Sequence, residues 1–566
     1  MKHSPSLRPR RLKARPLAVM LAVALLPLAQ ANTLPAGMNV AAGQASVQVN
    51  GGQMTVTNSA NAILNWQSFS VGAGNGVHFA QPGAASPVLN RVTGNDPSAI
   101  LGSLTSNGRV WLMNPNGVLF GQGARVDVAG LVVSTLNLGN QDWLAGRHAF
   151  SSTGTAAGVV NEGHLRTSLG GRVALLGGSV ENRGLIEAPG GQVVLAAGQS
   201  VELLDTGAPN LSVRVTAPQG EALNLGTLTA AGGRIDVHAA AVNQRGIVRA
   251  DSLERGPAGE IVLKASERLC LMAGSVTAAD GETGGHVKLL GREVGLFDDA
   301  SVSASGRLDG GEVFVGGGMQ GRDASLPNAQ ALFFGRDASI RADAQERGDG
   351  GRIILWSNAA TRAYGALSAR GGAAGGNGGF IETSGGWLDA RPRQLDVTAA
   401  RGRAGNWLLD PYDITIEDDY YMEGGGYGYD ASFTATSASA YITTTALNDA
   451  LATGAHVTVS TGGAVGTQAG TIYLNNANIG GSACGTTVCR LTLLADQDIY
   501  ATGYSSISGN FSEVRLRAGA EGAITFENAS VDVTGRIRAE ASRVTLESDA
   551  WFRSASSGDA IVISNG

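Results

Sequence analysis

A short phrase, Gly-(Gly)-x-apolar-x-apolar, recurs through the middle of this chain and constrains its fold more than any other feature. Its copies are GGRVALLG at 170, GGQVVLAAG at 190, GGRIDVHAA at 232, GEIVLKA at 259, GGHVKLLG at 284, GGEVFVGGG at 310, GGRIILWS at 350 and GGFIETSG at 378. Successive starts differ by 20, 42, 27, 25, 26, 40 and 28 residues. Self-similarity at such a period is typical of solenoids, in which each repeat packs only against its neighbours.

The residues inside the repeat indicate which solenoid to expect. Apolar positions alternate and favour Val, Ile and Leu, as in strands with one buried face. The segments are too short and too rich in Gly for ankyrin or tetratricopeptide helices, and they lack the Leu ladder and fixed Asn of leucine-rich repeats. Gly accounts for 83 of 566 residues and aromatics for only 5%, which suits tight turns around a narrow core. The sequence therefore predicts an all-β fold, a parallel β-helix.

The first 31 residues have the pattern of a signal peptide. A basic stretch precedes an apolar run at 17–28, and Ala-Gln-Ala at 29–31 fits a cleavage site. The apolar run is shorter than the roughly 18 residues that a membrane-spanning helix needs. Taking its six basic residues from the 41 Lys and Arg leaves 35, against 47 Asp and Glu, a net charge of −12. Nucleic acid is therefore not an expected partner.

Residues 87–138 contain three apolar runs, 99–104, 110–113 and 126–133, separated by turns of Asn, Asp, Gly and Pro. The last of these turns is Asn114-Pro115-Asn116-Gly117. Proline presets φ and glycine tolerates positive φ, so these four residues by themselves predict a tight turn.

With its flanks, VLNRVTGNDPSAILGSL and GRVWLMNPNGVLFGQGARVDVAGLVVST, this stretch closely resembles the secretion domain of filamentous-haemagglutinin-like exoproteins. These are the exported partners of two-partner secretion systems. ILNWQSFSVGAGNGVHFAQP upstream and WLLDPYDITI downstream are similar to the same family, so the resemblance covers 39–416.

The resemblance implies a right-handed parallel β-helix, export by the Sec translocon, and passage through a dedicated outer-membrane β-barrel transporter. It also implies that Asn114, Pro115, Asn116 and Gly117 form the secretion motif. A second motif of some members, NPNL, is not found in this sequence, so the transporter subtype is left open. Folding that propagates coil by coil from a capped N-terminus would give such export a direction.

We expect four segments: a signal peptide at 1–31, a capped two-partner secretion domain at 32–270, β-helix repeats at 271–400, and a further β-rich solenoid segment at 401–566. The cap is expected because the open end of a solenoid exposes unpaired strand edges. Within the last segment, residues 443–452 have helical spacing, with Thr to cap the start and Gly454 after the end. The final residues show no evident cap, which predicts a chain shortened relative to longer relatives, or one closed by association.

The sequence contains no pattern typical of catalysis. The six His of the mature chain show no metal-ligand spacing, and neither GxSxG nor Walker A is found. Residues 316–321 fit GxGxxG, which chance supplies among so many glycines. The acidic pairs at 298–299 and 418–419 are interpreted as solvated turn charges rather than a calcium or lyase site. We predict no catalytic residue, metal or cofactor, and hence no enzyme.

Arg347-Gly348-Asp349 lies in a turn just before a core strand and is a candidate for docking an integrin-type receptor. The alternative is an ordinary glycine-containing turn.

Cys484 and Cys489 are candidates for a small disulfide loop in an exported protein, with two unpaired thiols as the alternative. Cys270 is interpreted as a small buried apolar residue.

The sequence thus predicts a secreted exoprotein of haemagglutinin or adhesin type. Its expected partners are the outer-membrane transporter, the Sec translocon and a host cell-surface or glycan receptor. Two alternatives on the same scaffold are a haem- or haemopexin-acquisition exoprotein and a shortened contact-dependent toxin carrier. The expected location is extracellular, either released or retained at the outer-membrane surface of a Gram-negative bacterium.

Overall fold

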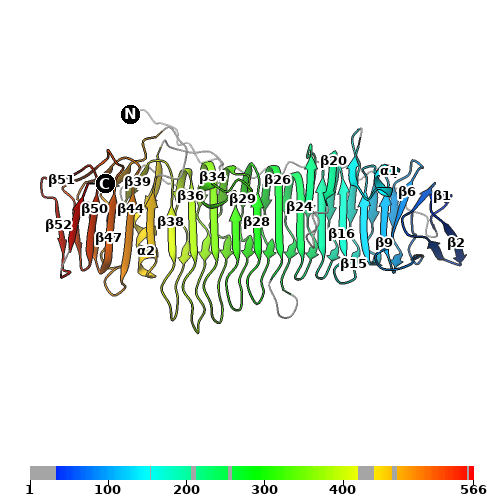
Figure 1. Cartoon of the computed structure of the whole chain (residues 1–566), viewed down its shortest axis with the longest axis horizontal. Coiled ribbons are helices and arrows are strands. Elements are labelled where there is room, and N and C mark those ends of the chain that lie inside the picture. Colours follow the sequence, from blue (N-terminus) through cyan, green and yellow to red (C-terminus); the bar gives the residue numbers. More distant parts are fainter. Residues whose placement is uncertain are drawn as a thin grey trace, which may run out of the picture.

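The computed structural model describes residues 33–152, 154–204, 212–252, 258–418, 439–461, 468–557 and 560–565. Over these residues the chain winds into one long rod that runs from β1 at one end to the last strands at the other (Figure 1). Neighbouring strands come from successive coils and pair in parallel. The predicted parallel β-helix is therefore confirmed. The predicted signal peptide lies outside the described residues.

Each coil contributes to three faces of the rod, which we call faces 1, 2 and 3. Four long strands turn the corner from face 1 to face 2 without a break: β24 (Arg234–Gln244), β26 (Glu260–Leu271), β34 (Arg352–Ala363) and β36 (Phe380–Ala390). The other strands of face 1 are β1 (Asn39–Ala42), β4 (Ala62–Trp66), β6 (Pro87–Val92), β9 (Arg109–Met113), β12 (Gly130–Ser134), β16 (Arg172–Gly177), β19 (Gln192–Ala197), β28 (His286–Leu290), β31 (Glu312–Val315), β38 (Asn406–Leu409), β41 (His456–Ser460), β44 (Cys489–Leu494), β47 (Phe511–Arg517), β50 (Arg536–Glu540) and β53 (Ile561–Ser564).

Face 2 is completed by shorter strands. They are β7 (Ser98–Ile100), β10 (Val118–Phe120), β14 (Gly158–Asn161), β17 (Ser179–Asn182), β22 (Glu221–Asn224), β29 (Glu293–Leu296), β32 (Ala329–Phe334), β39 (Ile414–Glu417), β40 (Ala440–Thr443), β42 (Ile472–Asn475), β45 (Ile499–Thr502), β48 (Ala523–Glu527) and β51 (Arg543–Glu547).

Face 3 consists of two separate sheets. The first holds β2 (Ala45–Asn50), β3 (Gln53–Asn58), β5 (Gly76–Ala80), β8 (Ser103–Ser106), β11 (Arg125–Val128), β15 (His164–Thr167), β18 (Leu185–Glu187), β23 (Thr227–Thr229), β25 (Ile247–Arg249), β27 (Val276–Ala278), β30 (Ser301–Ser303), β33 (Ser339–Arg341), β35 (Ala366–Ser368) and β37 (Gln394–Asp396). The second holds β43 (Asn478–Gly480), β46 (Ser506–Gly509), β49 (Ser530–Val533) and β52 (Trp551–Ser554).

The register of face 1 explains the spacing of the sequence repeat. The paired positions that begin successive coils are Arg172, Gln192, Arg234, Glu260, His286, Glu312, Arg352 and Phe380. The two long steps are insertions at the corner after face 1. One carries β20 (Ser200–Leu204) and β21 (Ser212–Thr216), and the other is the loop at 316–328 that precedes β32.

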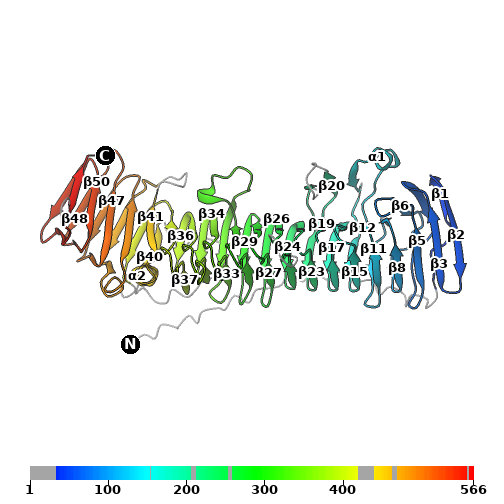
Figure 2. The same cartoon turned by 60° about the horizontal axis from the view of Figure 1, so that its bottom comes forward.

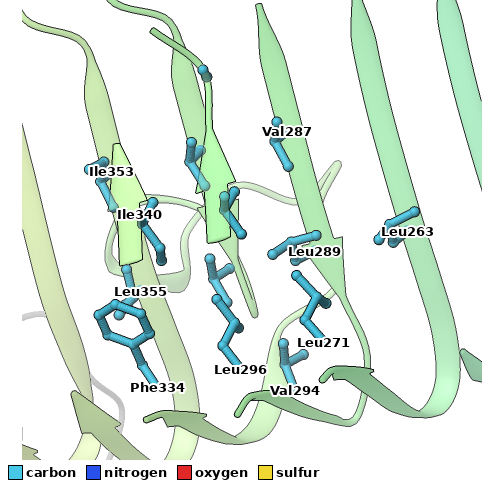
Figure 3. Close-up of a cluster of buried hydrophobic side chains, with 14 of the residues drawn as sticks. Leu263, Leu271, Val287, Leu289, Val294, Leu296, Phe334, Ile340, Ile353 and Leu355 are labelled. Atoms are coloured by element: carbon cyan, nitrogen blue, oxygen red, sulfur yellow. The ribbon is translucent and has the colours of Figure 1, made fainter. Parts of the chain in front are cut away.

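The core lies inside the rod, where apolar side chains of successive coils stack in rows. Leu263, Leu289, Val315 and Leu355 occupy one such row and have 0–1% of their surface exposed. Figure 3 shows three of them among the buried side chains of neighbouring coils. Each coil therefore buries its apolar residues against the next coil, which is why no coil is stable alone.

The N-terminal cap is built from antiparallel strands. β1 pairs antiparallel with β4, and β2 pairs antiparallel with β3, so the first coil is closed by a reversal of the chain. This confirms the expected cap.

The predicted helix is also present, as α2 (Thr444–Ala452). The Thr443 hydroxyl accepts a hydrogen bond from the Ala446 N–H at 3.3 Å, and Gly454 follows with φ +83°. The helix contacts β37 on one side and β43 on the other, so it lies where face 3 changes from one sheet to the next (Figure 2). No helix among the described residues is long and apolar enough to cross a membrane.

Candidate functional site

The predicted turn at residues 114–117 joins β9 on face 1 to β10 on face 2, close to the capped end of the rod. The Gly117 N–H donates to the Asn114 carbonyl at 3.1 Å, and Gly117 has φ +119°, which an L side chain rarely adopts. Pro115 and Asn116 are exposed, whereas Asn114 and Gly117 are buried. The turn is therefore fixed from below and presents two residues to solvent.

Asn114 holds this turn to the preceding coil. Its side chain is fully buried, and its Nδ2 donates to the Asp96 carbonyl at 3.0 Å and to the Ser98 hydroxyl at 2.9 Å. Its Oδ1 accepts from the backbone N–H of Asn116 at 3.0 Å and from the Asn116 side chain at 3.1 Å. Both polar ends of the amide are thus satisfied within the protein.

The preceding turn, at residues 94–97, supports the motif directly. Asn116 Nδ2 donates to the Gly94 carbonyl at 2.9 Å. A Cβ on Gly94 would lie 2.2 Å from the Gln67 carbonyl oxygen, so only glycine fits there. The two turns therefore stack on one another, whereas the sequence showed them only as two separate turns.

A second apolar layer covers the outer surface of face 1 beside these turns. α1 (Asn140–Leu144), β13 (His148–Ser151), β20 and β21 lie over the outward side chains of β4 to β19 (Figure 2). Trp111 is central, with ring centroids 5.0 Å from Trp143 and 5.9 Å from Phe150. Trp143 Nε1 donates to the Asn61 carbonyl at 3.0 Å. Strands of this region are therefore buried on both faces, and their continuous apolar runs are the sequence signal of it.

The receptor-binding candidate lies at the other edge of face 1, in a turn before β34. Asp349 N–H donates to the Asp309 carboxylate at 3.0 Å, and the Asp349 Oδ1 accepts from the Asn377 N–H at 2.7 Å. Asn377 Oδ1 in turn accepts from the Arg403 N–H at 3.1 Å. Asp349 is exposed, but its carboxylate belongs to a ladder that links successive coils. Arg347, two residues before it, is exposed.

Cys484 and Cys489 form a disulfide, with Cα atoms 5.7 Å apart, at the turn between β43 and β44. Cys270 is a buried free thiol on β26, and burial raises its pKa to about 11. A thiol with so high a pKa is a poor nucleophile at neutral pH.

A buried amide ladder escaped the sequence analysis. Asn161 Nδ2 donates to Asn182 Oδ1 at 2.8 Å, and Asn182 Nδ2 donates to Asn224 Oδ1 at 2.8 Å. Asn224 Nδ2 donates to Gln244 Oε1 at 2.7 Å. The signal was the phrase Asn/Gln-x-Gly, which stands at 161, 182, 224 and 244, each time just before a strand of face 3.

The described residues hold no cluster of three or more His, Cys, Asp or Glu placed to bind a metal. Histidines pair singly, as His164 does with Glu187 at 2.5 Å. Asp299 accepts from the Gly274 N–H at 2.7 Å, and Asp418 accepts from Asn478 Nδ2 at 3.4 Å. Its neighbour at 419 lies outside the described residues. The acidic pairs thus contain turn-stabilising acceptors, and the glycine phrase at 316–321 begins the inserted loop before β32.

Comparison with known proteins gives a consistent result. The TPS secretion domain family matches residues 29–310. A heme/hemopexin-binding protein of Haemophilus influenzae is 35% identical over 225 residues, which is 38% of this chain and 25% of that protein. A second protein of that name from Haemophilus influenzae is 44% identical over 87 residues, 15% of this chain and 9% of the relative. The matches thus span a quarter or less of these curated relatives.

Among solved structures, the chain is similar to the HMW1 secretion domain from Haemophilus influenzae. The TM-score is 0.61 at 34% identity, and the match covers 66% of this chain and 100% of that one.

Proposed function

The chain belongs to the TPS secretion domain family, the exoproteins of two-partner secretion, and we propose that the turn at 114–117 is the surface its outer-membrane transporter recognises. The protein is a secreted exoprotein, exported across the outer membrane by a partner transporter. The observation that carries the proposal is the burial of Asn114 beneath the exposed pair Pro115 and Asn116. A rigid, solvent-facing turn within the matched region is suited to recognition by the transporter, because a preorganised surface loses little conformational entropy on binding.

The experiment is export of the full chain with and without a co-expressed two-partner secretion transporter. Secreted protein should accumulate in the medium only with the transporter. Asn116→Ala, which removes the side-chain bond to Gly94, should leave most of the protein in the periplasm. Asn377→Ala is the matched control, since it also removes an exposed turn amide that bridges coils, outside 29–310. Equal export of both variants would contradict the proposal.

The rod beyond the secretion domain would then carry the binding activity of an adhesin. Its support is the length of regular solenoid that extends away from the capped end (Figure 1). A host cell-surface or glycan receptor remains the proposed partner. The engagement of Asp349 in its ladder argues for a receptor contact elsewhere on the rod, and Asp349→Glu tests this: cell binding should not change.

The second candidate, capture of haem or haemopexin, is favoured by the names of the two curated relatives. The purified secreted chain separates the two functions. Titration with hemin, followed by Soret absorbance, and pull-down of haemopexin should be positive for an acquisition protein. Binding to host cells without either signal supports the adhesin.

A further inference from the structure

The inserted loop at residues 316–328, which we call the strap, lies across the outer surface of face 1. It leaves the corner after β31 and contacts β34 and β36 before β32 begins. The Ala329 N–H donates to the Gly316 carbonyl, which joins the two ends of the loop, and Asn328 Nδ2 donates to the Gly321 carbonyl at 2.8 Å, which ties the second end to the middle. In Figure 2 the loop beside the label β34 rises from the same side of the rod as β20.

Gln320 fastens the strap to two carboxyl groups of the rod. Its backbone N–H donates to both carboxyl oxygens of Glu382, at 3.0 and 3.2 Å. Its side-chain Nε2 donates to the Asp410 Oδ2 at 2.7 Å. Gln320 has φ +52°, an unusual conformation for a residue with a side chain, which the two carboxyl groups hold in place.

Both carboxyl groups are fully buried, although they project from the outer surface of the rod. Glu382 belongs to β36, and Asp410 follows β38 in the next coil. Beneath the strap also lies Trp356, with only 3% of its surface exposed. A Cβ on Gly321 would approach the indole nitrogen of Trp356 to 2.4 Å, so the strap and the ring are in close contact. The strap thus covers two acids and a tryptophan on an otherwise solvent-facing side.

Burial raises the pKa of Glu382 to about 8, and the neighbouring Asp410 raises it as well. The Ser384 hydroxyl, the Gln320 N–H and the Arg322 guanidinium act in the opposite direction. Glu382 forms no ion pair with another described residue. A carboxyl group that is buried beside another carboxyl favours its neutral form.

We propose that the strap is a proton-operated latch: neutral Glu382 keeps it closed over face 1, and ionisation of Glu382 beside Asp410 releases it. Two neighbouring carboxylates in a water-excluded space repel each other, and the strap is the element that can move to admit water. Release uncovers Trp356 on the surface of the rod. The latch is therefore a device that exposes an aromatic contact in response to pH.

The direction of the pH dependence follows from the raised pKa. The stabilisation of the closed strap is fully present below the ordinary glutamate value of 4.5 and is lost as pH rises through the value near 8. Between these two values, the single ionisation lowers the ratio of closed to open strap by up to about tenfold per pH unit, and above the value near 8 the ratio levels off because Glu382 is then ionised in both states.

Hydrogen exchange of the full secreted chain, read by mass spectrometry, tests the latch. Exchange of the peptide that covers 316–328 is compared at pH 6 and pH 9 after correction for the base-catalysed intrinsic rate. Protection of the strap should fall by up to about a hundredfold between these values, because two pH units of the window below pH 8 lie between them, while protection of the neighbouring core strands stays constant. Equal corrected protection at both pH values would overturn the proposal.

Two variants assign the effect to Glu382. Glu382→Gln keeps a carbonyl oxygen for the Gln320 N–H but cannot ionise, so the strap should stay protected at both pH values. Asp323→Asn removes an exposed carboxylate of the strap itself, which accepts from Ser325, and should leave the pH dependence intact. If the exchange of the strap still depends on pH in Glu382→Gln, the proposed latch is refuted. If that variant does not fold, the wild-type and Asp323→Asn measurements still decide.

Discussion

Replacing Thr277 by valine should stabilise the rod. Thr277 lies on β27 with its side chain in the core, and its hydroxyl oxygen is buried without a hydrogen-bond partner. The residues opposite it in the coils on either side are Val248 and Val302, which are 1% and 0% exposed. Valine has nearly the shape of threonine, so the substitution extends an existing valine row.

The expected gain follows from the unsatisfied hydroxyl. Burying a polar group that makes no hydrogen bond costs about 1–3 kcal/mol, and valine removes that group without leaving a cavity. We therefore expect Thr277→Val to raise the free energy of unfolding of its region by about 1–3 kcal/mol. In a solenoid the effect should be confined to the coils that share the row.

The assay is native-state hydrogen exchange of strands β25, β27 and β30, supported by urea unfolding followed by circular dichroism. Thr229→Val, at a partly exposed outward position of β23, is the matched control and should change stability by less than about 0.5 kcal/mol. Unchanged or lower protection around Thr277→Val would refute the reasoning, because it would mean that the hydroxyl is satisfied.

Three further outcomes are expected. The pKa of His286, measured by NMR, should lie above 6.5 because Glu312 accepts its hydrogen bond, and Glu312→Gln should lower that pKa. The stabilisation that this pair gives the folded protein is present below pH 6.5 and is lost as pH rises through the raised pKa. Replacing both Cys484 and Cys489 by Ala should cost about 2 kcal/mol, seen as faster exchange around β44, since the closed loop is short. Asn182→Ala, which breaks the buried amide ladder, should cost about 2–4 kcal/mol in urea unfolding, because it leaves buried amides unpaired on both sides.

The fold was predictable from the sequence because every coil of a solenoid repeats the same strands, turns and packing against its neighbours, so the sequence repeats as well. The Gly-(Gly) phrase marks where each coil enters face 1, and its spacing matches the register of the strands. The doubled steps showed where insertions lie but not what they form. One is a hairpin over face 1 and the other is the strap, and neither contains the repeated phrase from which its structure could be predicted.

The corners of the coils were not visible in the sequence. The apolar run at 99–104 is divided into β7 and β8, and the run at 126–133 is divided into β11 and β12. Inward-facing residues continue on both sides of a corner, so hydrophobicity does not drop where the chain bends. Only the pairing with the next coil defines the break.

The candidate site was identified by residue type and order, but its support was not. The turn chemistry of Asn114 and Gly117 is local and can be derived from backbone sterics. The bonds from Asn114 to Asp96 and Ser98 join different coils, so they could not be derived from the local sequence. The hydrogen bonds of Asp349 were hidden for the same reason, because its partners lie 40 and 28 residues away.

By itself, the sequence determined that this protein is a capped parallel β-helix with a tight turn at 114–117 near its capped end, because strand periodicity, glycine spacing and turn residues act over short distances. Only the tertiary structure decided which polar groups are buried: the amide ladder from Asn161 to Gln244, and Glu382 with Asp410 beneath the strap. The burial of a side chain on a solenoid depends on what the neighbouring coils place over it. That information is distributed along the chain at separations of twenty to ninety residues, beyond the reach of any local pattern.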